Sequence, residues 1–106
     1  MNKYKDKVVL VTGASRGIGK AIANKFARQG AFVIGTATTQ ASADIISKNI
    51  TADNFTGIGL VLNIADKLSV DEFGNKLKEL DAPNILVNNA GITRDNLLMR
   101  MKDHEG

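Results

Sequence analysis

Residues 8–19 constrain the fold more than any other stretch of this chain. They begin with four consecutive branched apolar residues, Val8-Val9-Leu10-Val11, and continue into Thr12-Gly13-Ala14-Ser15-Arg16-Gly17-Ile18-Gly19. Such an apolar run suits a strand that is covered on both faces, as in a parallel sheet. Residues 20–29 repeat apolar side chains at helical spacing, and Gly30 stands where a helix favours a left-handed stop. The segment therefore predicts a buried strand, a glycine turn and a helix, in that order.

The glycine turn has the arrangement of an anion-binding loop. Free backbone N–H groups and the positive end of the helix dipole both face a ligand at a helix N-terminus. Gly13 would permit the tight turn, Gly17 a close approach of phosphate, and Gly19 the packing of helix on strand. An ordinary tight connection between a strand and a helix is the alternative. A phosphate-binding loop of the NTPase type is excluded, because Gly19-Lys20 is followed by Ala21 rather than by Ser or Thr.

Strand-like and helix-like segments alternate along the rest of the chain. Short apolar runs at 31–35, 57–62 and 84–87 predict three further strands, and residues 40–50 and 69–80 predict helices between them. This alternation with short loops favours βαβ units and a parallel sheet. Right-handed crossovers then give the strand order 3-2-1-4, which is one half of a Rossmann-type, doubly wound α/β fold.

The predicted helices have amphipathic sequences. In the helix predicted at residues 40–50, the core-facing residues are expected to be Ala41, Ile45, Ile46 and Ile50. The helix predicted at residues 69–80 is expected to begin with a capping box, since Ser69 is followed three residues later by Glu72. Its core-facing residues are expected to be Val70, Phe73, Leu77 and Leu80. A further amphipathic helix is expected to begin within residues 92–106.

The end of the second predicted strand bears on the choice of dinucleotide. Sites that prefer NAD hold the ribose 2′-hydroxyl with an acidic residue near this position. Here the sequence is Gly35-Thr36-Ala37-Thr38, without a carboxylate. Arg16 in the glycine loop could instead meet a 2′-phosphate, because a guanidinium matches phosphate geometry. A solvated surface arginine is the alternative, but the missing acid favours NADP (NADPH) over NAD.

Two polar segments follow other predicted strands at the same edge of the sheet. Asn63 ends the third strand, where it could approach an adenine with Ile64 beside it, and Asn88-Asn89-Ala90-Gly91 follows the fourth. Parallel sheets bind ligands at the carboxyl ends of their strands. Both segments are also ordinary turn sequences, which is the alternative interpretation of each.

Composition narrows the class of protein. The chain has 106 residues, no cysteine and a net charge of +3, so it can form neither a disulfide framework nor a thiolate metal site. Lys3, Lys5 and Lys7 precede the first strand without arginines or interleaved aromatic residues, which favours a solvated edge over a nucleic-acid surface. No apolar run approaches the length of a membrane span. We therefore expect a cytoplasmic protein with no metal centre and no nucleic-acid or membrane partner.

Two motifs at this separation resemble those of the short-chain dehydrogenases/reductases: Thr12-Gly13-x-x-x-Gly17-x-Gly19 and Asn88-Asn89-Ala90-Gly91. Residues 12–19, 35–38 and 89–102 more narrowly resemble bacterial 3-oxoacyl-[acyl-carrier-protein] reductases, and the likeness is weakest between residues 40 and 56. The resemblance implies NADPH-dependent hydride transfer to 3-oxoacyl groups on acyl carrier protein, in fatty-acid biosynthesis. It also implies that residues 1–106 form the NADP-binding N-terminal half of a single Rossmann domain, with no second domain.

The same resemblance assigns cofactor contacts. Residues 13–19 would hold the pyrophosphate and the 2′-phosphate side, and Thr38 would also face the 2′-phosphate. Asn63 and Ile64 would face the adenine, residues 89–91 the ribose on the nicotinamide side, and Asn88 would stabilise the central sheet. The predicted cofactor-binding residues are Gly13, Ala14, Ser15, Arg16, Gly17, Ile18, Gly19, Thr38, Asn63, Ile64, Asn89, Ala90 and Gly91.

The catalytic residues that the resemblance implies are missing from this sequence, so no catalytic residue is predicted. Members of that family carry a Ser and a Tyr-x-x-x-Lys pair downstream, whereas the one tyrosine here, Tyr4, is followed four residues later by Val8. General acid catalysis typically contributes about 10²–10⁴-fold, so we expect this chain alone to be inactive. A non-catalytic NADP-binding module and an inert remnant are the alternatives. The complete enzyme would be a homo-oligomer, and the edge at residues 85–87 would make this fragment prone to self-association.

Overall fold

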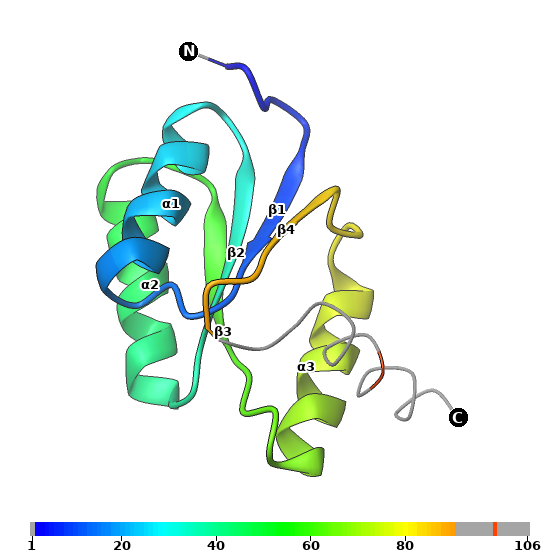
Figure 1. Ribbon diagram of the computed structural model, residues 1–106. Helices are drawn as coiled ribbons and strands as arrows, with labels where there is room; N and C mark the ends of the chain where they lie inside the picture. Colours follow the sequence, from blue (N-terminus) through cyan, green and yellow to red (C-terminus); the bar gives the residue numbers. More distant parts are fainter. Residues whose placement is uncertain (1, 91–98, 100–106) are drawn as a thin grey trace.

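The computed structural model describes residues 2–90 and residue 99. Strands and helices alternate in the order β1 (Val8–Val11), α1 (Gly17–Arg28), β2 (Phe32–Ala37), α2 (Gln40–Ala52), β3 (Gly57–Val61), α3 (Lys67–Glu79) and β4 (Ile85–Val87). Neighbouring strands are parallel, and the order β3-β2-β1-β4 confirms the predicted α/β fold. Helices α1 and α2 cover one face of the sheet and α3 covers the other (Figure 1). This is the first half of a Rossmann fold.

Strand β1 lies at the centre of the sheet, between β2 and β4. All four of its side chains are buried, and successive side chains of a strand point to opposite faces. Val9 and Val11 pack with residues of α1 and α2, whereas Val8 and Leu10 pack with residues of α3. A strand covered on both faces has no position for a polar side chain, which is why the apolar run predicted this strand correctly.

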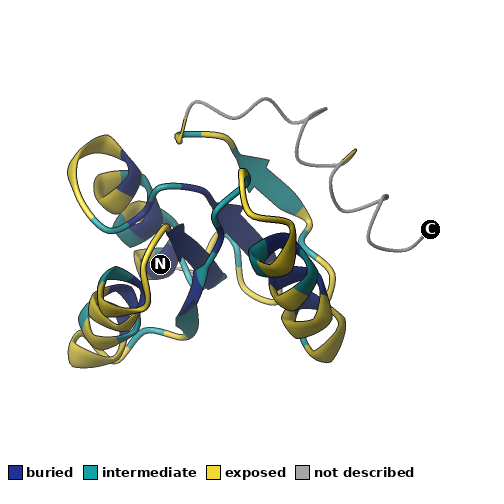
Figure 2. Ribbon diagram, turned by 90° about the horizontal axis from the view of Figure 1, so that it is seen from below, coloured by how far each residue is buried: buried dark blue, intermediate teal, exposed yellow. Residues whose placement is uncertain are grey.

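Strand β4 forms one edge of the four-stranded sheet. Its three residues are half-buried, in contrast to the buried residues of β1 (Figure 2). Asn84 fixes where β4 begins: its Oδ1 accepts the Val8 N–H at 2.8 Å, and its own N–H donates to the Val8 carbonyl at 2.7 Å. Two hydrogen bonds to one residue set the register of β4 against β1. Self-association through this edge stays a prediction.

Helix α1 begins at Gly17, three residues earlier than predicted, so its first turn is part of the glycine loop. Its buried positions are the small residues Gly19, Ala23 and Ala27, and Ile22 and Phe26 are half-buried against the same cluster as the two alanines. The predicted left-handed stop is confirmed at Gly30, whose φ is +93°. Strand β2 begins one residue later than predicted and continues to Ala37.

The predicted core face of α2 was wrong in part. Ala41 and Ile45 are exposed, Ile45 to 48%. The helix lies so close to β3 that a Cβ added to Gly59 would collide with the Ala43 carbonyl oxygen. Only a small residue fits that contact, which turns the Ala43 side of the helix inward and Ile45 outward. The buried residues are Ala43, Ile46 and Ile50.

The predicted start of α3 was also wrong. The helix begins at Lys67, and its N-cap is Asp66, whose carboxylate accepts the Leu68 N–H at 3.1 Å. Ser69 accepts the Asn63 N–H at 2.9 Å instead of capping the helix. A carboxylate is among the strongest N-caps, so the helix extends back to it. The predicted core residues Val70, Phe73 and Leu77 are buried, and Leu80 is half-buried beside them.

Two further expectations concern a helix near the end of the sequence and the absence of membrane spans. The helix predicted within 92–106 lies outside the described residues. Across the described part of the chain, every helix is too short or too polar to traverse a bilayer.

Candidate functional site

A cavity of about 430 Å³ lies at the carboxyl ends of the strands. The β1–α1 loop, the end of β2 and the segments that follow β3 and β4 all contribute to its wall, although they are far apart in the sequence. The parallel order of the strands brings these segments together, because all carboxyl ends meet at one edge. The lining residues are Gly13, Ser15, Arg16, Thr36, Ala37, Thr38, Leu62, Asn63, Ile64, Asn89 and Ala90.

Most of the predicted cofactor-binding residues line this cavity. Four do not: Ala14, Gly17, Ile18 and Gly19 lie in the same loop and the first turn of α1, and Gly91 lies outside the described residues. The sequence did not single out three of the lining residues, Thr36, Ala37 and Leu62. Thr36 and Ala37 could have been found from their position, because they are at the carboxyl end of β2, at the edge of the sheet where the glycine turn also lies. Cofactor contact by any of these residues stays a prediction.

The glycine turn is held from both sides through Gly13, whose φ is +64°. Its N–H donates to Thr36 Oγ1 at 3.2 Å, and its carbonyl accepts from Asn89 Nδ2 at 3.1 Å. The Ala14 N–H donates to the Thr36 carbonyl at 2.9 Å. The positive φ favours glycine, and a Cβ at this position would lie only 3.0 Å from the Ala90 Cβ. The contacts from β2 and from the segment after β4 then fix the turn in one conformation.

Thr12 joins the glycine turn to the segment after β4. Its side chain is fully buried, and its Oγ1 accepts the N–H groups of Asn89 at 3.0 Å and of Ala90 at 3.2 Å. The same hydroxyl donates to the Val87 carbonyl at 3.5 Å. All three hydrogen-bonding positions of a hydroxyl are therefore used. One threonine fixes the relative position of two walls of the cavity.

Gly19 brings the first turn of α1 against the glycine turn. A Cβ at this position would collide with the Gly13 carbonyl oxygen and with Asn89 Nδ2. At Gly17, by contrast, an added Cβ would meet open space, although the φ of +62° disfavours other residues. The structure thus leaves room for a ligand beside Gly17 and none between Gly19 and the loop.

The electrostatics of the cavity favour an anion. Arg16 is the N-cap residue of α1, its side chain makes no cap hydrogen bond, and the first turn of α1 contains no acidic residue. Arg16 is exposed and, within residues 2–90, its guanidinium forms no ion pair. Thr38, also exposed, follows β2 on the same wall. None of the lining residues is acidic, so a free guanidinium and a helix N-terminus face the cavity together.

Asn63 is fixed at the end of β3 by three hydrogen bonds. Its N–H donates to Ser69 Oγ at 2.9 Å, its carbonyl accepts the Asp66 N–H at 3.0 Å, and its Oδ1 accepts the Ala65 N–H at 3.1 Å. Its Nδ2 group has no partner among the residues that the structure describes. The side chain therefore presents amide donors at the wall of the cavity.

Tyr4 lies at the opposite end of the sheet from this cavity. It precedes β1, its ring packs edge-on against Phe26 at 5.0 Å, and its N–H donates to the Gln29 carbonyl at 2.8 Å. These contacts anchor the N-terminal segment to the end of α1. Over residues 2–90, no group of acidic, histidine or cysteine side chains is arranged to hold a metal ion.

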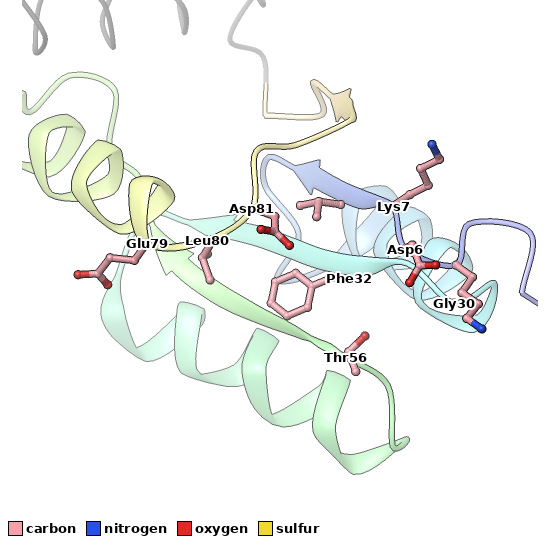
Figure 3. A pocket seen from close by; sticks show the side chains of 10 residues that line it. Asp6, Lys7, Gly30, Phe32, Thr56, Glu79, Leu80 and Asp81 are labelled. Carbon is pink, nitrogen blue, oxygen red and sulfur yellow. The ribbon is translucent and has the colours of Figure 1, made fainter.

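A second cavity, also about 430 Å³, lies at the amino ends of the strands. Phe32 of β2 forms part of it, with Leu80 to one side and Asp6 and Gly30 to the other (Figure 3). Five of its lining residues are charged, two positively and three negatively. This mixture favours no single charge of ligand. Its lining residues are Lys5, Asp6, Lys7, Val8, Gly30, Phe32, Thr56, Glu79, Leu80 and Asp81.

Comparison with known proteins places the chain beside a group of reductases. The family described as short chain dehydrogenase matches residues 7–105. The chain is 54% identical over 103 residues to the 3-oxoacyl-[acyl-carrier-protein] reductase FabG of Escherichia coli (strain K12), which covers 96% of this chain and 41% of the reductase. It is 55% identical over 100 residues to the FabG of Vibrio harveyi, covering 93% of this chain and 40% of that protein. The chain thus spans about two fifths of the length of these relatives.

Proposed function

The chain belongs to the short-chain dehydrogenase family, and we propose that it forms the NADPH-binding part of an enzyme that reduces 3-oxoacyl groups on acyl carrier protein. The cavity at the carboxyl ends of the strands carries this proposal, because a free guanidinium and a helix N-terminus meet there without a carboxylate. The names of the similar reductases support the choice of substrate. Acyl carrier protein would then be a partner of the enzyme.

The residues that are present fit a dinucleotide with a 2′-phosphate. The amides of Gly13 and Ala14 are already donated to Thr36, so the amides left for a pyrophosphate come from the rest of the loop and the first turn of α1. Arg16 and Thr38 would face the 2′-phosphate, and an acidic residue that would repel it is absent from the lining. Asn63 Nδ2 would donate to the adenine, and Asn89 and Ala90 would face the ribose on the nicotinamide side.

The contribution of this chain to the reaction would be to bind and orient the cofactor. NADPH supplies a hydride when it is bound. Thr36 Oγ1 accepts the Gly13 N–H, Asn89 Nδ2 donates to the Gly13 carbonyl, and Thr12 Oγ1 in turn accepts the Asn89 N–H. These hydrogen bonds hold the glycine turn before a ligand arrives, which lowers the cost of ordering on binding. The proton for the carbonyl oxygen would come from residues other than Tyr4, since that side chain packs on Phe26 at the far end of β1.

Nucleotide titration tests the binding part of this proposal. We expect the chain to bind NADPH at least about tenfold more tightly than NADH, since charge-assisted contacts to phosphate are strong. Arg16→Ala should weaken NADPH binding about 10- to 100-fold and leave NADH binding within about twofold. Arg28→Ala, an exposed arginine at the other end of α1, is the matched control and should change neither. If the Arg16→Ala chain bound NADPH as tightly as the original chain does, the proposal would be contradicted.

A second candidate is a module that binds NADP without catalysing a reaction, which is also consistent with a cavity lined by no tyrosine among the described residues. The two candidates differ in a complementation assay that follows oxidation of NADPH by a 3-oxoacyl thioester. The 106-residue chain is mixed with the part of the E. coli reductase that lies beyond the matched region. An enzyme part should give turnover that requires both polypeptides and is lost in Arg16→Ala. A binding module should bind NADPH but give no turnover, whether the original chain or the Arg16→Ala chain is mixed with that part of the reductase.

A further inference from the structure

Among the described residues only two polar side chains are classed as buried, Thr12 and Thr36, and both lie beside Gly13. They use their hydroxyl groups differently. The Thr12 oxygen accepts two backbone N–H groups, and its hydrogen is donated to the Val87 carbonyl. The Thr36 oxygen accepts one N–H, that of Gly13, and this is the side chain's one hydrogen bond within residues 2–90.

The Thr36 hydroxyl therefore retains a hydrogen that it does not donate to the described part of the protein. A hydroxyl carries one donor and two acceptor positions, and a buried donor without an acceptor is costly. Thr36 is 3% exposed, and it lines the cavity at the carboxyl ends of the strands, whereas Thr12 does not. The unused donor thus belongs to the one buried threonine that borders the space where a ligand would lie.

Its neighbours indicate which part of a nucleotide this hydroxyl would meet. Thr36 lies between Gly13, to which it is hydrogen-bonded, and Thr38, which is two residues further along the chain. Thr36 is in β2 and Thr38 is in the bend that follows it, and both line the same cavity as Arg16. Gly13 begins the phosphate-binding turn, and Thr38 follows β2, where dinucleotide sites hold the adenosine ribose. A donor between them faces the ribose rather than the adenine or the nicotinamide.

We propose that Thr36 is a binding residue of the nucleotide site: its oxygen holds the Gly13 amide while its hydroxyl hydrogen is donated to an oxygen at the 2′ or 3′ position of the adenosine ribose. This inference rests on the proposed binding of NADPH. It also explains why the strand end carries a threonine, since valine would fill the same buried volume without either hydrogen bond.

The test compares Thr36→Val with Thr36→Ser, using NADPH as the probe. Thr36→Val should weaken NADPH binding about tenfold, the value of roughly one hydrogen bond, and Thr36→Ser should stay within about threefold of the original chain. Thr56→Val is the control, because the Thr56 side chain also makes a hydrogen bond, which it donates to the Ala31 carbonyl, but lies beside the cavity at the amino ends. It should leave NADPH binding unchanged. If Thr36→Val does not fold, Thr36→Cys replaces it, since a thiol is a much weaker donor.

Changes in the ligand separate donation to the ribose from a role in holding Gly13 alone. If the acceptor is the 2′-phosphate, the loss caused by Thr36→Val should shrink to within about threefold when NADH replaces NADPH. If it is the 3′-hydroxyl, the loss should shrink with 3′-deoxy-NADPH. An equal loss with all three nucleotides would overturn the inference, as would unchanged NADPH binding by Thr36→Val. Failure of the original chain to bind NADPH would instead refute the proposed function.

Discussion

The two ends of one sheet carry cavities of the same size, about 430 Å³ each, that differ in chemistry. The cavity at the amino ends is bordered by five charged side chains of both signs, from Lys5, Asp6, Lys7, Glu79 and Asp81. The cavity at the carboxyl ends is bordered by one charged side chain, Arg16. Volume therefore does not distinguish a binding site from a surface hollow in this molecule.

The direction of the backbone explains the difference. In a parallel sheet joined by helices, each helix begins just after a carboxyl end, so its free N–H groups and positive dipole face that edge. The helices end at the other edge, where their last carbonyls carry the opposite partial charge, and the last turns of α1 and α3 contain lysine and arginine. Only the carboxyl edge offers backbone donors to an anion.

The largest expected effect concerns the two glycines at opposite ends of α1. Gly19→Ala should reduce NADPH affinity at least about 100-fold, because its methyl group would displace the Gly13 carbonyl and the Asn89 side chain. Gly30→Ala, at a φ of +93°, should cost about 1 kcal/mol of stability and leave NADPH affinity within about twofold. Fluorescence titration gives the NADPH affinity of each variant, and urea unfolding gives its stability. Similar losses of affinity in the two would remove the distinction between the ends.

An intermediate effect is expected from a carboxylate placed at each end. Thr38→Asp should weaken NADPH binding about tenfold or more, through repulsion of the 2′-phosphate, and should not weaken NADH binding. Thr56→Asp places the same group beside the other cavity, also at an exposed threonine, and should change neither affinity. The ratio of the two dissociation constants in each variant is the measurement. A preference for NADPH that survives in Thr38→Asp would show that the phosphate lies elsewhere.

The smallest effect is expected from the lysines at the amino end. Removing both, as Lys5→Ala with Lys7→Ala, should alter NADPH affinity by less than about twofold at physiological salt, because exposed charges beyond a Debye length are screened. Titrations at low and physiological salt test this. A tenfold loss in the double variant would mean that the amino-end cavity takes part in nucleotide binding.

Much of this fold could be predicted because its local signals agree with one another. The apolar run of β1, the glycine turn and the stop at Gly30 each have a single backbone solution, and all of them are present in the structure. The face of α2 and the start of α3 could not be predicted in the same way. Close packing of α2 on Gly59 decided the first, and competition between Asp66 and Ser69 for the cap decided the second.

The candidate site likewise contains residues that could be predicted from the sequence and one that could not. The sequence placed Arg16, Thr38, Asn63 and Asn89 at one edge, since each follows a predicted strand, and the structure brings all four to one cavity. Thr36 was not among the predicted site residues, because the predicted strand ended at residue 35 and the segment after it was considered only for its lack of a carboxylate. Its importance became visible only from the Gly13 N–H that it accepts across two strands.

The sequence by itself determined the order of the strands, the helix that follows the glycine turn and the edge of the sheet at which polar residues gather. These depend on periodicity, on glycine conformations and on the handedness of crossovers. The first two kinds of signal, periodicity and glycine conformation, are local, and the right-handedness of crossovers is a general rule that needs no knowledge of particular contacts. The tertiary structure decided which hydrogen bonds hold the glycine turn and which hydroxyl remains free to meet a ligand. Those depend on atoms that are brought together from strands far apart in the chain, and no local pattern encodes their distances.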